Sequence, residues 1–337
     1  MGVKLTELVP KEELSWEKLN NKVLALDASN VIYQFVSSIR QPDGTPLKDK
    51  HGNITSHLVG LFSRTTNLLT KGLKPAFVFD GKPPKLKQKE IERRKAIKSQ
   101  AKEKYEQAKE DEDEASMLKY SRQVSKLTPD MIKEAKELVK ALGLPVIQAP
   151  SEAEAQAAYI CRKKNAWAVA SQDYDCLLFK APRLIQNLTL AEKRKLPGGG
   201  YVKVYPQLLE LSKVLESLEI DHDQLLVLGI LVGTDFNPGG IKGIGPKKAL
   251  KLIQEEKPFE MIFEELKPDF DWKEIFDLFK NMPVTDDYSM EFNDIDEEKV
   301  KEILVEKHDF SVERVENTLN KINEDKSKGQ TSLLSFG

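Results

Sequence analysis

Cysteine and histidine are scarce in this chain of 337 residues. The two cysteines, Cys161 and Cys176, form no C-x-x-C pair, and the four histidines include no H-E-x-x-H motif. These absences argue against a disulfide-stapled scaffold and against a zinc site, and they suit a reducing compartment. Oxygen ligands would have to hold any bound metal, which disfavours the softer transition metals.

Long hydrophobic runs and a large net charge are also missing. No apolar run approaches the roughly 20 residues that a membrane helix needs, and no signal peptide opens the chain. The net charge is −2 and the pI about 6.2, so composition alone does not indicate nucleic-acid binding. Contacts with DNA would have to come from local basic patches.

Short apolar runs alternate with helical patterns along the sequence. This alternation predicts an α/β fold with a mostly parallel central sheet covered by helices on both faces. Strands are expected at 22–27, 74–81, 145–148, 166–171 and 183–186, and helices at 54–69 and 129–142, among others. Ligands of such sheets bind beyond the carboxyl ends of the strands.

Carboxylates follow three of these strands. Asp27 ends the first, Asp80 follows the second, and Asp173 and Asp175 come directly after the strand at 166–171. A single Asp in such a place commonly caps a helix or starts a turn. Acids from three distant strands that reach one edge of a sheet are harder to explain as caps, and a cation between them would relieve their repulsion.

Three further acids extend this pattern. Glu152 and Glu154 begin a helix, where Ser151 and Glu154 also fit a capping box and Glu152 suits the helix dipole. Asp235 follows an apolar run, at a helix end where a negative charge is unfavourable. Many carboxylates together could hold two Mg²⁺ ions, which activate water and stabilise the leaving oxygen of a phosphodiester. A solvated turn remains the alternative for Asp173 and Asp175.

Two basic elements accompany the acids. The segment 82–128 begins with a lysine- and arginine-rich run that includes Lys87 and Arg94, and it is expected to form a projecting helical insertion. These cations could attract phosphates, although a charged run is usually a solvated helix face. The segment 240–249 resembles a helix-hairpin-helix with Gly243, Gly245, Lys247 and Lys248, in which backbone amides could meet a phosphate. A plain glycine turn is the alternative.

Five stretches together resemble the flap endonuclease family, in its archaeal form. They are 26–29 (LDAS), 77–84 (FVFDGKPP), 149–155 (APSEAEA), 171–175 (SQDYD) and 233–236 (GTDF), and their order and spacing cover nearly the whole chain. The family implies a structure-specific 5′ flap endonuclease and 5′–3′ exonuclease that uses two Mg²⁺ ions, for which Mn²⁺ can substitute, in lagging-strand maturation and DNA repair.

The resemblance also implies roles for individual residues. The metal ligands would be Asp27, Asp80, Glu152, Glu154, Asp173, Asp175 and Asp235. Lys87 and Arg94 would act in catalysis beside the scissile phosphate, Tyr33 would stack on the adjacent base, and Gly2 would lie near the site. Tyr33 taken alone suggests a half-buried core aromatic. The hairpin element at 229–256 would grip duplex DNA, with K⁺ as a further ligand.

The sequence ends in a polar tail at 323–337, which is expected to stay flexible until bound. Its end is similar to the family's sliding-clamp motif through Gln330, Leu333 and Phe336, but Gly337 stands where the motif has a second aromatic. A frayed terminus is the alternative. Residues 1–322 are expected to form one nuclease domain of a monomer, located in the cytoplasm at the nucleoid if the protein is archaeal.

Three other functions compete with this prediction. A small-molecule phosphatase also places Asp after a strand, but it commonly uses Asp-x-Asp, whereas this chain has Asp27-Ala28-Ser29. A non-catalytic DNA-junction binder would be expected to have lost some of the seven acids. A related nuclease for bubbles or Holliday junctions is the third, and the compact insertion between Asp80 and Glu152 favours the flap type.

Overall fold

A seven-stranded sheet forms the centre of the protein, for which a computed structural model describes residues 3–334 except 42, 190–192, 196–198 and 256. The strand order is β1-β9-β6-β5-β2-β3-β4. The strands are β1 (Glu12–Glu13), β2 (Val23–Asp27), β3 (Lys74–Phe79), β4 (Val146–Gln148), β5 (Ala168–Ala170), β6 (Arg183–Gln186) and β9 (Gln207–Glu210).

The central strands run parallel, which confirms the predicted fold class. β6, β5, β2, β3 and β4 pair in parallel, whereas β9 pairs antiparallel with both β6 and β1 at one edge. All five parallel strands therefore present their carboxyl ends at one edge of the sheet, where the acids were expected. A separate antiparallel ribbon, β7 (Lys193–Lys195) and β8 (Tyr201–Lys203), was not predicted.

Helices cover both faces of the sheet, because successive strand side chains point to opposite sides. In β2, Leu24 and Leu26 belong to one hydrophobic cluster and Ala25 to the other. The helices are α1 (Ala28–Ser38), α2 (Ser56–Thr70), α3 (Gln88–Glu110), α4 (Glu114–Val124), α5 (Pro129–Ala141), α6 (Ala153–Arg162), α7 (Asp175–Leu178), α8 (Leu211–Leu218), α9 (His222–Val232), α10 (Pro246–Gln254), α11 (Phe259–Leu266), α12 (Trp272–Lys280), α13 (Glu297–Lys301) and α14 (Val312–Leu334).

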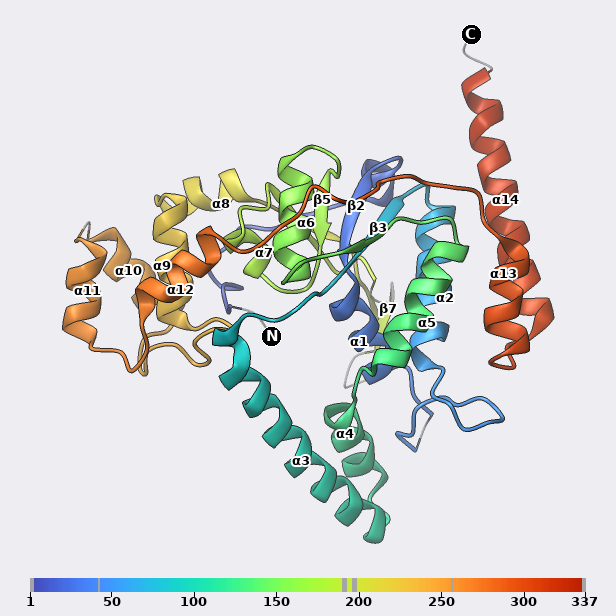
Figure 1. Ribbon diagram of the computed structural model, residues 1–337, viewed down its shortest axis with the longest axis horizontal. Helices are drawn as coiled ribbons and strands as arrows, with labels where there is room; N and C mark the ends of the chain where they lie inside the picture. Colours follow the sequence, from blue (N-terminus) through green and yellow to red (C-terminus); the bar gives the residue numbers. More distant parts are fainter. Residues whose placement is uncertain (1–2, 42, 190–192, 196–198, 256, 335–337) are drawn as a thin grey trace.

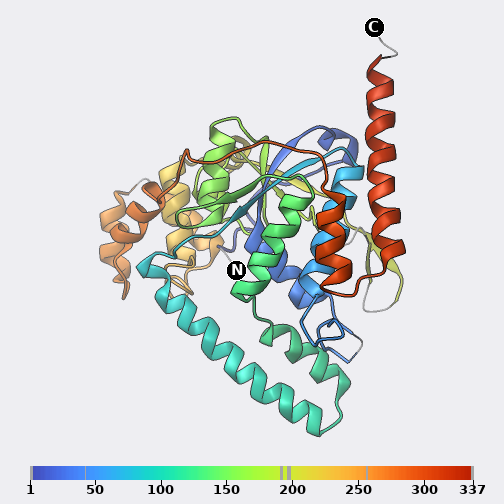
Figure 2. The same ribbon diagram turned by 45° about the vertical axis from the view of Figure 1, so that its right-hand side comes forward.

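The charged insertion consists of two helices that leave the body of the protein. α3 and α4 contact each other and project below the sheet as a V-shaped arm in both views (Figures 1 and 2). In α3 only Glu90, Ala101 and Ala108 are buried, because this helix lacks an apolar stripe. α4 returns to the body, where Ser125 accepts a hydrogen bond from Arg40.

On the other side of the molecule, α9 and α10 pack together and are joined by the glycine-rich loop at 233–245 (Figure 1). The α9 sequence is almost entirely buried, from Leu225 to Leu231. A long connection, 281–296, then crosses the molecule to α13, with Asn293 and Asp296 donating backbone hydrogen bonds to Gly143 and Ala141.

The final helix differs from the expected boundary of the tail. α14 continues from Val312 to Leu334, past residue 323, because the polar residues there include good helix formers and no proline. It extends away from the body toward the C-terminus (Figure 1). Within the described part of the chain, no helix is both long enough and apolar enough to cross a membrane.

Candidate active site

Asp27 occupies the junction of β2 and α1. Its carboxylate accepts a hydrogen bond of 3.0 Å from the backbone amide of Asn30 and so caps α1. The side chain of Asn30 in turn donates to Asp173, at 2.8 Å. One residue in the first turn of α1 therefore links two acids that are distant in the sequence.

Asp80 lies on a segment that is tied to the loop after β4. Its carboxylate accepts from the backbone amide of Ala153 at 2.8 Å, at the N-terminus of α6. The Gly81 amide donates to the Ser151 carbonyl at 2.6 Å. The side-chain amide of Gln148 donates to the carbonyl oxygen of Asp80 at 2.7 Å. These bonds fix Asp80 relative to the glutamates that follow.

Glu152 and Glu154 lie at the start of α6, and the capping-box alternative is wrong. The N-cap residue is Glu152, whose own side chain makes no capping hydrogen bond, and the first amide of the helix donates to Asp80 instead. Ser151 donates instead to the carbonyl of Lys82, while Glu154 accepts a hydrogen bond of 3.1 Å from Ser171. Glu154 is thus drawn toward the end of β5 rather than toward its own helix terminus.

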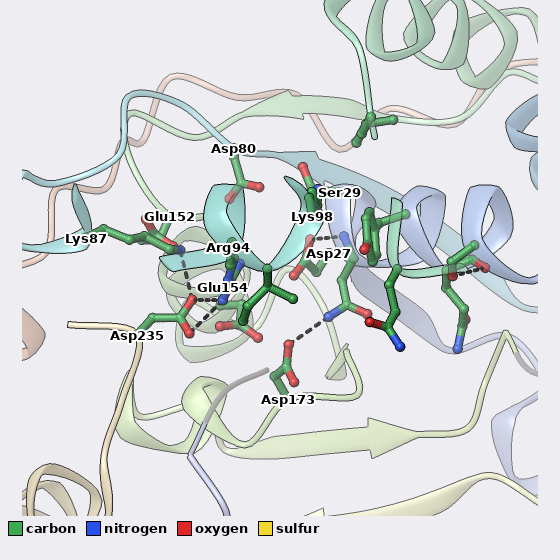
Figure 3. A pocket seen from close by; sticks show the side chains of 17 residues that line it. Asp27, Ser29, Asp80, Lys87, Arg94, Lys98, Glu152, Glu154, Asp173 and Asp235 are labelled. Carbon is green, nitrogen blue, oxygen red and sulfur yellow. Dashed lines mark hydrogen bonds and ion pairs between the residues drawn. The ribbon is translucent and has the colours of Figure 1, made fainter. Parts of the chain in front are cut away.

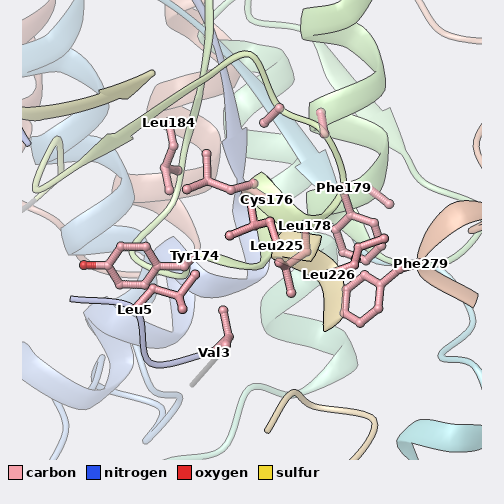
Figure 4. Packing of buried hydrophobic residues seen from close by; sticks show 14 of the residues in the cluster. Val3, Leu5, Tyr174, Cys176, Leu178, Phe179, Leu184, Leu225, Leu226 and Phe279 are labelled. Atoms are coloured by element: carbon pink, nitrogen blue, oxygen red, sulfur yellow. The ribbon is translucent and has the colours of Figure 1, made fainter. Parts of the chain in front are cut away.

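Asp173 lies in the turn before α7, and Asp175 is the first residue of that helix. The buried carboxylate of Asp175 accepts from the Val3 backbone amide at 2.7 Å. Val3 is itself buried and packs in one cluster with Leu5 and Tyr174 (Figure 4). The N-terminal segment thereby helps to hold Asp175.

Asp235 follows α9 in a tight turn. The buried Asn237 side chain accepts from Thr234 at 2.8 Å and donates to the Ile230 carbonyl at 2.7 Å. This turn directs Asp235 toward the arm, where Arg94 donates to both carboxylate oxygens, at 2.8 and 2.9 Å.

These acids surround one cavity of about 600 Å³ at the carboxyl edge of the sheet (Figure 3). Six of the seven acids line it, and Asp175 does not. The lining acids are Asp27, Asp80, Glu152, Glu154, Asp173 and Asp235. The cavity continues between α1 and the arm past Tyr33, which is 37% exposed, to Gln123 and Leu127.

Two cations of the arm reach into this acidic site. Lys87 ends the short 3₁₀ turn Lys85–Lys87 before α3, and its amine pairs with Glu152 and lies 3.3 Å from Asp235. Arg94 contacts Asp235 and also donates to the buried Glu90 at 2.6 Å. Glu90, which was not predicted, therefore orients Arg94. The solvated-face alternative is wrong for Lys87 and Arg94.

Burial and repulsion between neighbouring carboxylates raise the pKa of several acids in the site. Burial raises the pKa of Glu154 well above its ordinary value, and Asp175 adds to the rise. Burial and then Asp80 do the same to the pKa of Asp27. Burial and then Asp235 raise the pKa of Asp175 to about 7. The folded chain thus holds several carboxylates where their charge is costly, which is a feature of functional sites.

The donor set fits hard divalent cations. Every acid offers oxygen, and Mg²⁺ binds through few carboxylates because it keeps several waters. Among the described residues no group of three His, Cys, Asp or Glu side chains is preassembled as a metal cage. Lys87, Arg94 and the amides of Val3 and Ala153 contact four of the acids. Cations would have to compete with Lys87 and Arg94 for Glu152 and Asp235.

The remaining predicted contacts lie elsewhere. Gly243, Lys247 and Lys248 are exposed in or after the α9–α10 loop, and Gly245 is the N-cap of α10. Gly243 has a φ of +82° and the ideal β-carbon built on it meets no atom within 4 Å, so its backbone is open to a ligand. Gln330 and Leu333 fall within α14, where only the backbone is described, and Gly2, Phe336 and Gly337 lie outside the described residues.

Sequence reasoning missed the residues that hold the acids in place. Asn30, Val3 and Gln148 touch acids or their backbone only because distant segments meet in the fold. Asn237 alone had a local signal, because it follows Asp235 in a turn typical of Asn and Pro.

Replacing Asn30 with alanine is expected to weaken activity or metal affinity by roughly 10- to 100-fold, because the orienting bond to Asp173 is lost. The Mg²⁺ concentration for half-maximal cleavage measures the effect. Asn67→Ala in α2 provides a matched control, since Asn67 does not line the cavity. An Asn30→Ala variant with unchanged metal requirement would contradict the orienting role.

Comparison with known proteins agrees with this geometry. The XPG N-terminal domain matches residues 1–101, and the XPG I-region matches residues 143–235. Flap endonuclease 1 of Aeropyrum pernix is 49% identical, with 100% of this chain and 99% of the relative covered. That of Thermococcus onnurineus is also 49% identical, with 99% and 98% covered. The chain belongs to the flap endonuclease 1 family.

Solved structures agree with this assignment. The flap endonuclease-1 from Methanococcus jannaschii matches with a TM-score of 0.78 and 40% identity, covering 97% of this chain and 100% of that one. The catalytic core of Rad2, in a complex with DNA substrate, matches with a TM-score of 0.66 and 25% identity over 93% of this chain and 95% of its own. Human GEN1, at 21% identity, shares the fold.

As a flap endonuclease, the chain is a structure-specific, metal-dependent nuclease that acts in DNA processing. The prediction of a flap endonuclease is therefore confirmed. The two alternatives, a small-molecule phosphatase and a non-catalytic DNA-junction binder, are not confirmed.

Proposed function

We propose that this flap endonuclease hydrolyses branched DNA at the base of a 5′ flap, with two Mg²⁺ ions held by the seven acids. The single observation that carries this proposal is the cavity in which six acids face Lys87 and Arg94 (Figure 3). When bound, the ions supply an activated water and stabilise the leaving oxygen of the phosphodiester. Mn²⁺, with similar preferences for oxygen ligands, is expected to substitute.

The chain's own residues bind and orient the substrate. Lys87 and Arg94 each contact a carboxylate of the cavity, so their charges lie where a phosphate bound beside those acids would be. When Lys87 and Arg94 exchange their carboxylate partners for the phosphate, they stabilise the bound strand. Their charges also neutralise the negative charge that develops in the transition state. Tyr33, exposed in the cavity wall, offers its ring to the neighbouring base.

Other contacts complete the proposal. The amides around Gly243 and Gly245, with Lys247 and Lys248, bind phosphates of the duplex, and the same loop takes K⁺. The arm of α3 and α4 receives the 5′ strand. The tail binds a sliding clamp through Gln330, Leu333 and Phe336, and the enzyme acts as a monomer.

Cleavage of a 5′-labelled double-flap duplex tests the proposed reaction. We expect Mg²⁺-dependent release of the flap near its base, none in EDTA, and a loss of roughly a hundredfold or more in Asp235→Asn, because a ligand charge and the partner of Arg94 are both changed. DNA binding by the variant, measured in EDTA, should persist. Cleavage that survives EDTA, or preference for bubbles or four-way junctions over flaps, would refute the proposal.

A further inference from the structure

A basic groove lies on the outer face of α5. It has a volume of about 360 Å³ and is lined by Pro129, Ile132, Lys133, Lys136, Glu137 and Lys140. Lys133 and Lys140 are exposed and Lys136 is half-buried. The groove is therefore lined by three positively charged side chains and one negatively charged side chain, Glu137. This groove is not part of the carboxylate cavity.

The groove adjoins the active site at its Pro129 end and again near its middle, at Lys136. Leu127 lines the carboxylate cavity and Pro129 lines the groove, so only the turn after α4 separates them. Farther along α5, Lys136 donates to Gln148 at 2.6 Å, and Gln148 donates to the backbone of Asp80 at 2.7 Å. Both views place the start of α5 directly above the end of α4 (Figures 1 and 2).

We propose that this groove binds the single-stranded 5′ flap where the flap leaves the arm. The inference rests on the proposed function, which brings such a strand through the cavity. The negative phosphates of the flap strand complement the positive charges of Lys133, Lys136 and Lys140. Lys133 and Lys140 are seven residues apart, which is about 10 Å along a helix. Two lysines at that distance can contact separate phosphates of one strand.

Two features of the groove suit a strand rather than a folded partner. Ile132 and Pro129 offer a small apolar floor against which a base can rest. Burial and then Lys140 lower the pKa of Lys136, so an anion in the groove would relieve a repulsion that the chain now carries. Contact with the flap here adds affinity only for flaps long enough to reach α5.

The double variant Lys133→Glu/Lys140→Glu tests this dependence on flap length. Lys136 is left unchanged because it supports Asp80 through Gln148. For a flap of about twenty nucleotides, we expect KM to rise roughly tenfold and the salt slope of binding to fall by about 1.4, as for two lost phosphate contacts on a single strand. Cleavage of a one-nucleotide flap should keep its KM and kcat.

Lys74→Glu/Lys164→Glu is the matched control, with the same change of charge at two exposed residues. Lys74 begins β3 and thus lies at the end of the sheet opposite the acids. The proposal would be overturned if Lys133→Glu/Lys140→Glu weakened the cleavage of short and long flaps equally. It would also be overturned if the control variant weakened the cleavage of long flaps to the same extent. Cleavage of short flaps by the wild type reports separately on the proposed function, so failure of the two ideas can be told apart.

Discussion

Replacing Asp175 with asparagine is expected to reduce cleavage by on the order of a thousandfold and yet to stabilise the metal-free protein. The neutral side chain keeps an oxygen for the Val3 amide but removes a buried negative charge from among the other acids. In EDTA at pH 8, we expect the free energy of unfolding to rise by about 2 kcal/mol, less than the full shift of the pKa would give because neighbouring acids share the repulsion.

The pH dependence of this gain in stability follows from the direction in which the pKa of Asp175 is shifted. The Asp175 pKa is raised from 3.8 to about 7 by burial and then by Asp235. Below pH 4 the group is protonated in the folded and the unfolded chain, so it costs nothing. Between pH 4 and pH 7 the unfolded chain is ionised while the folded chain still holds its proton, so the wild type loses stability as the pH rises through this window, and above pH 7 the loss is complete. The difference in unfolding free energy between variant and wild type should therefore stay nearly constant from pH 8 to pH 7 and shrink steadily from pH 7 to pH 4.

Chemical denaturation in EDTA, with cleavage assays in Mg²⁺, measures both effects. Asp269→Asn, at an exposed residue of the loop before α12, is the matched control and should change neither quantity. A variant of Asp175 that is less stable than wild type at pH 8, or one that still cleaves, would contradict a site built on repelling carboxylates.

Gly81→Ala is expected to be strongly damaging although Gly81 carries no chemistry of its own. A β-carbon at Gly81 would lie 2.2 Å from the Ala149 carbonyl oxygen and 2.4 Å from that of Pro150. Both obstacles are backbone, so the segment that follows β3 must move away from the loop that follows β4. We expect a loss of about 1–3 kcal/mol of stability and, since Asp80 moves with it, roughly a hundredfold slower cleavage.

Gly52→Asn provides the control for this substitution. Gly52 has a φ of +86°, which asparagine tolerates, and no atom lies within 4 Å of its ideal β-carbon. Single-turnover cleavage at saturating DNA separates slower chemistry from weaker binding. Normal single-turnover rates in Gly81→Ala would show that the two segments need not be held together as the structure has them.

The sequence was sufficient for the five parallel strands of the sheet and for the acids that follow them, because their signals are local. Buried strands such as β2 and β3 are continuous apolar runs that end in an acid. The β7–β8 ribbon escaped notice because its short strands are charged or exposed and lack an apolar alternation. The antiparallel β1 is only Glu12–Glu13, which carries no strand signal of its own.

The contacts that position the acids could not be predicted from local patterns. Val3 and Asp175 are separated by 172 residues, and the link exists only because the N-terminal segment packs beside α7. Glu90 reads as one more charge in a charged helix, yet it is buried against Arg93 and Arg94. The resemblance to the flap endonuclease family supplied the roles of Lys87 and Arg94, whereas the structure supplies their partners.

The most direct test of the central claim is a crystal structure of the enzyme with a flap duplex and Mn²⁺, with anomalous scattering used to locate the ions. We predict two Mn²⁺ peaks about 4 Å apart in the carboxylate cavity. Lys87 and Arg94 should have turned from Glu152 and Asp235 to the DNA phosphate. A single peak, or ions bound outside the seven acids, would contradict the two-metal account.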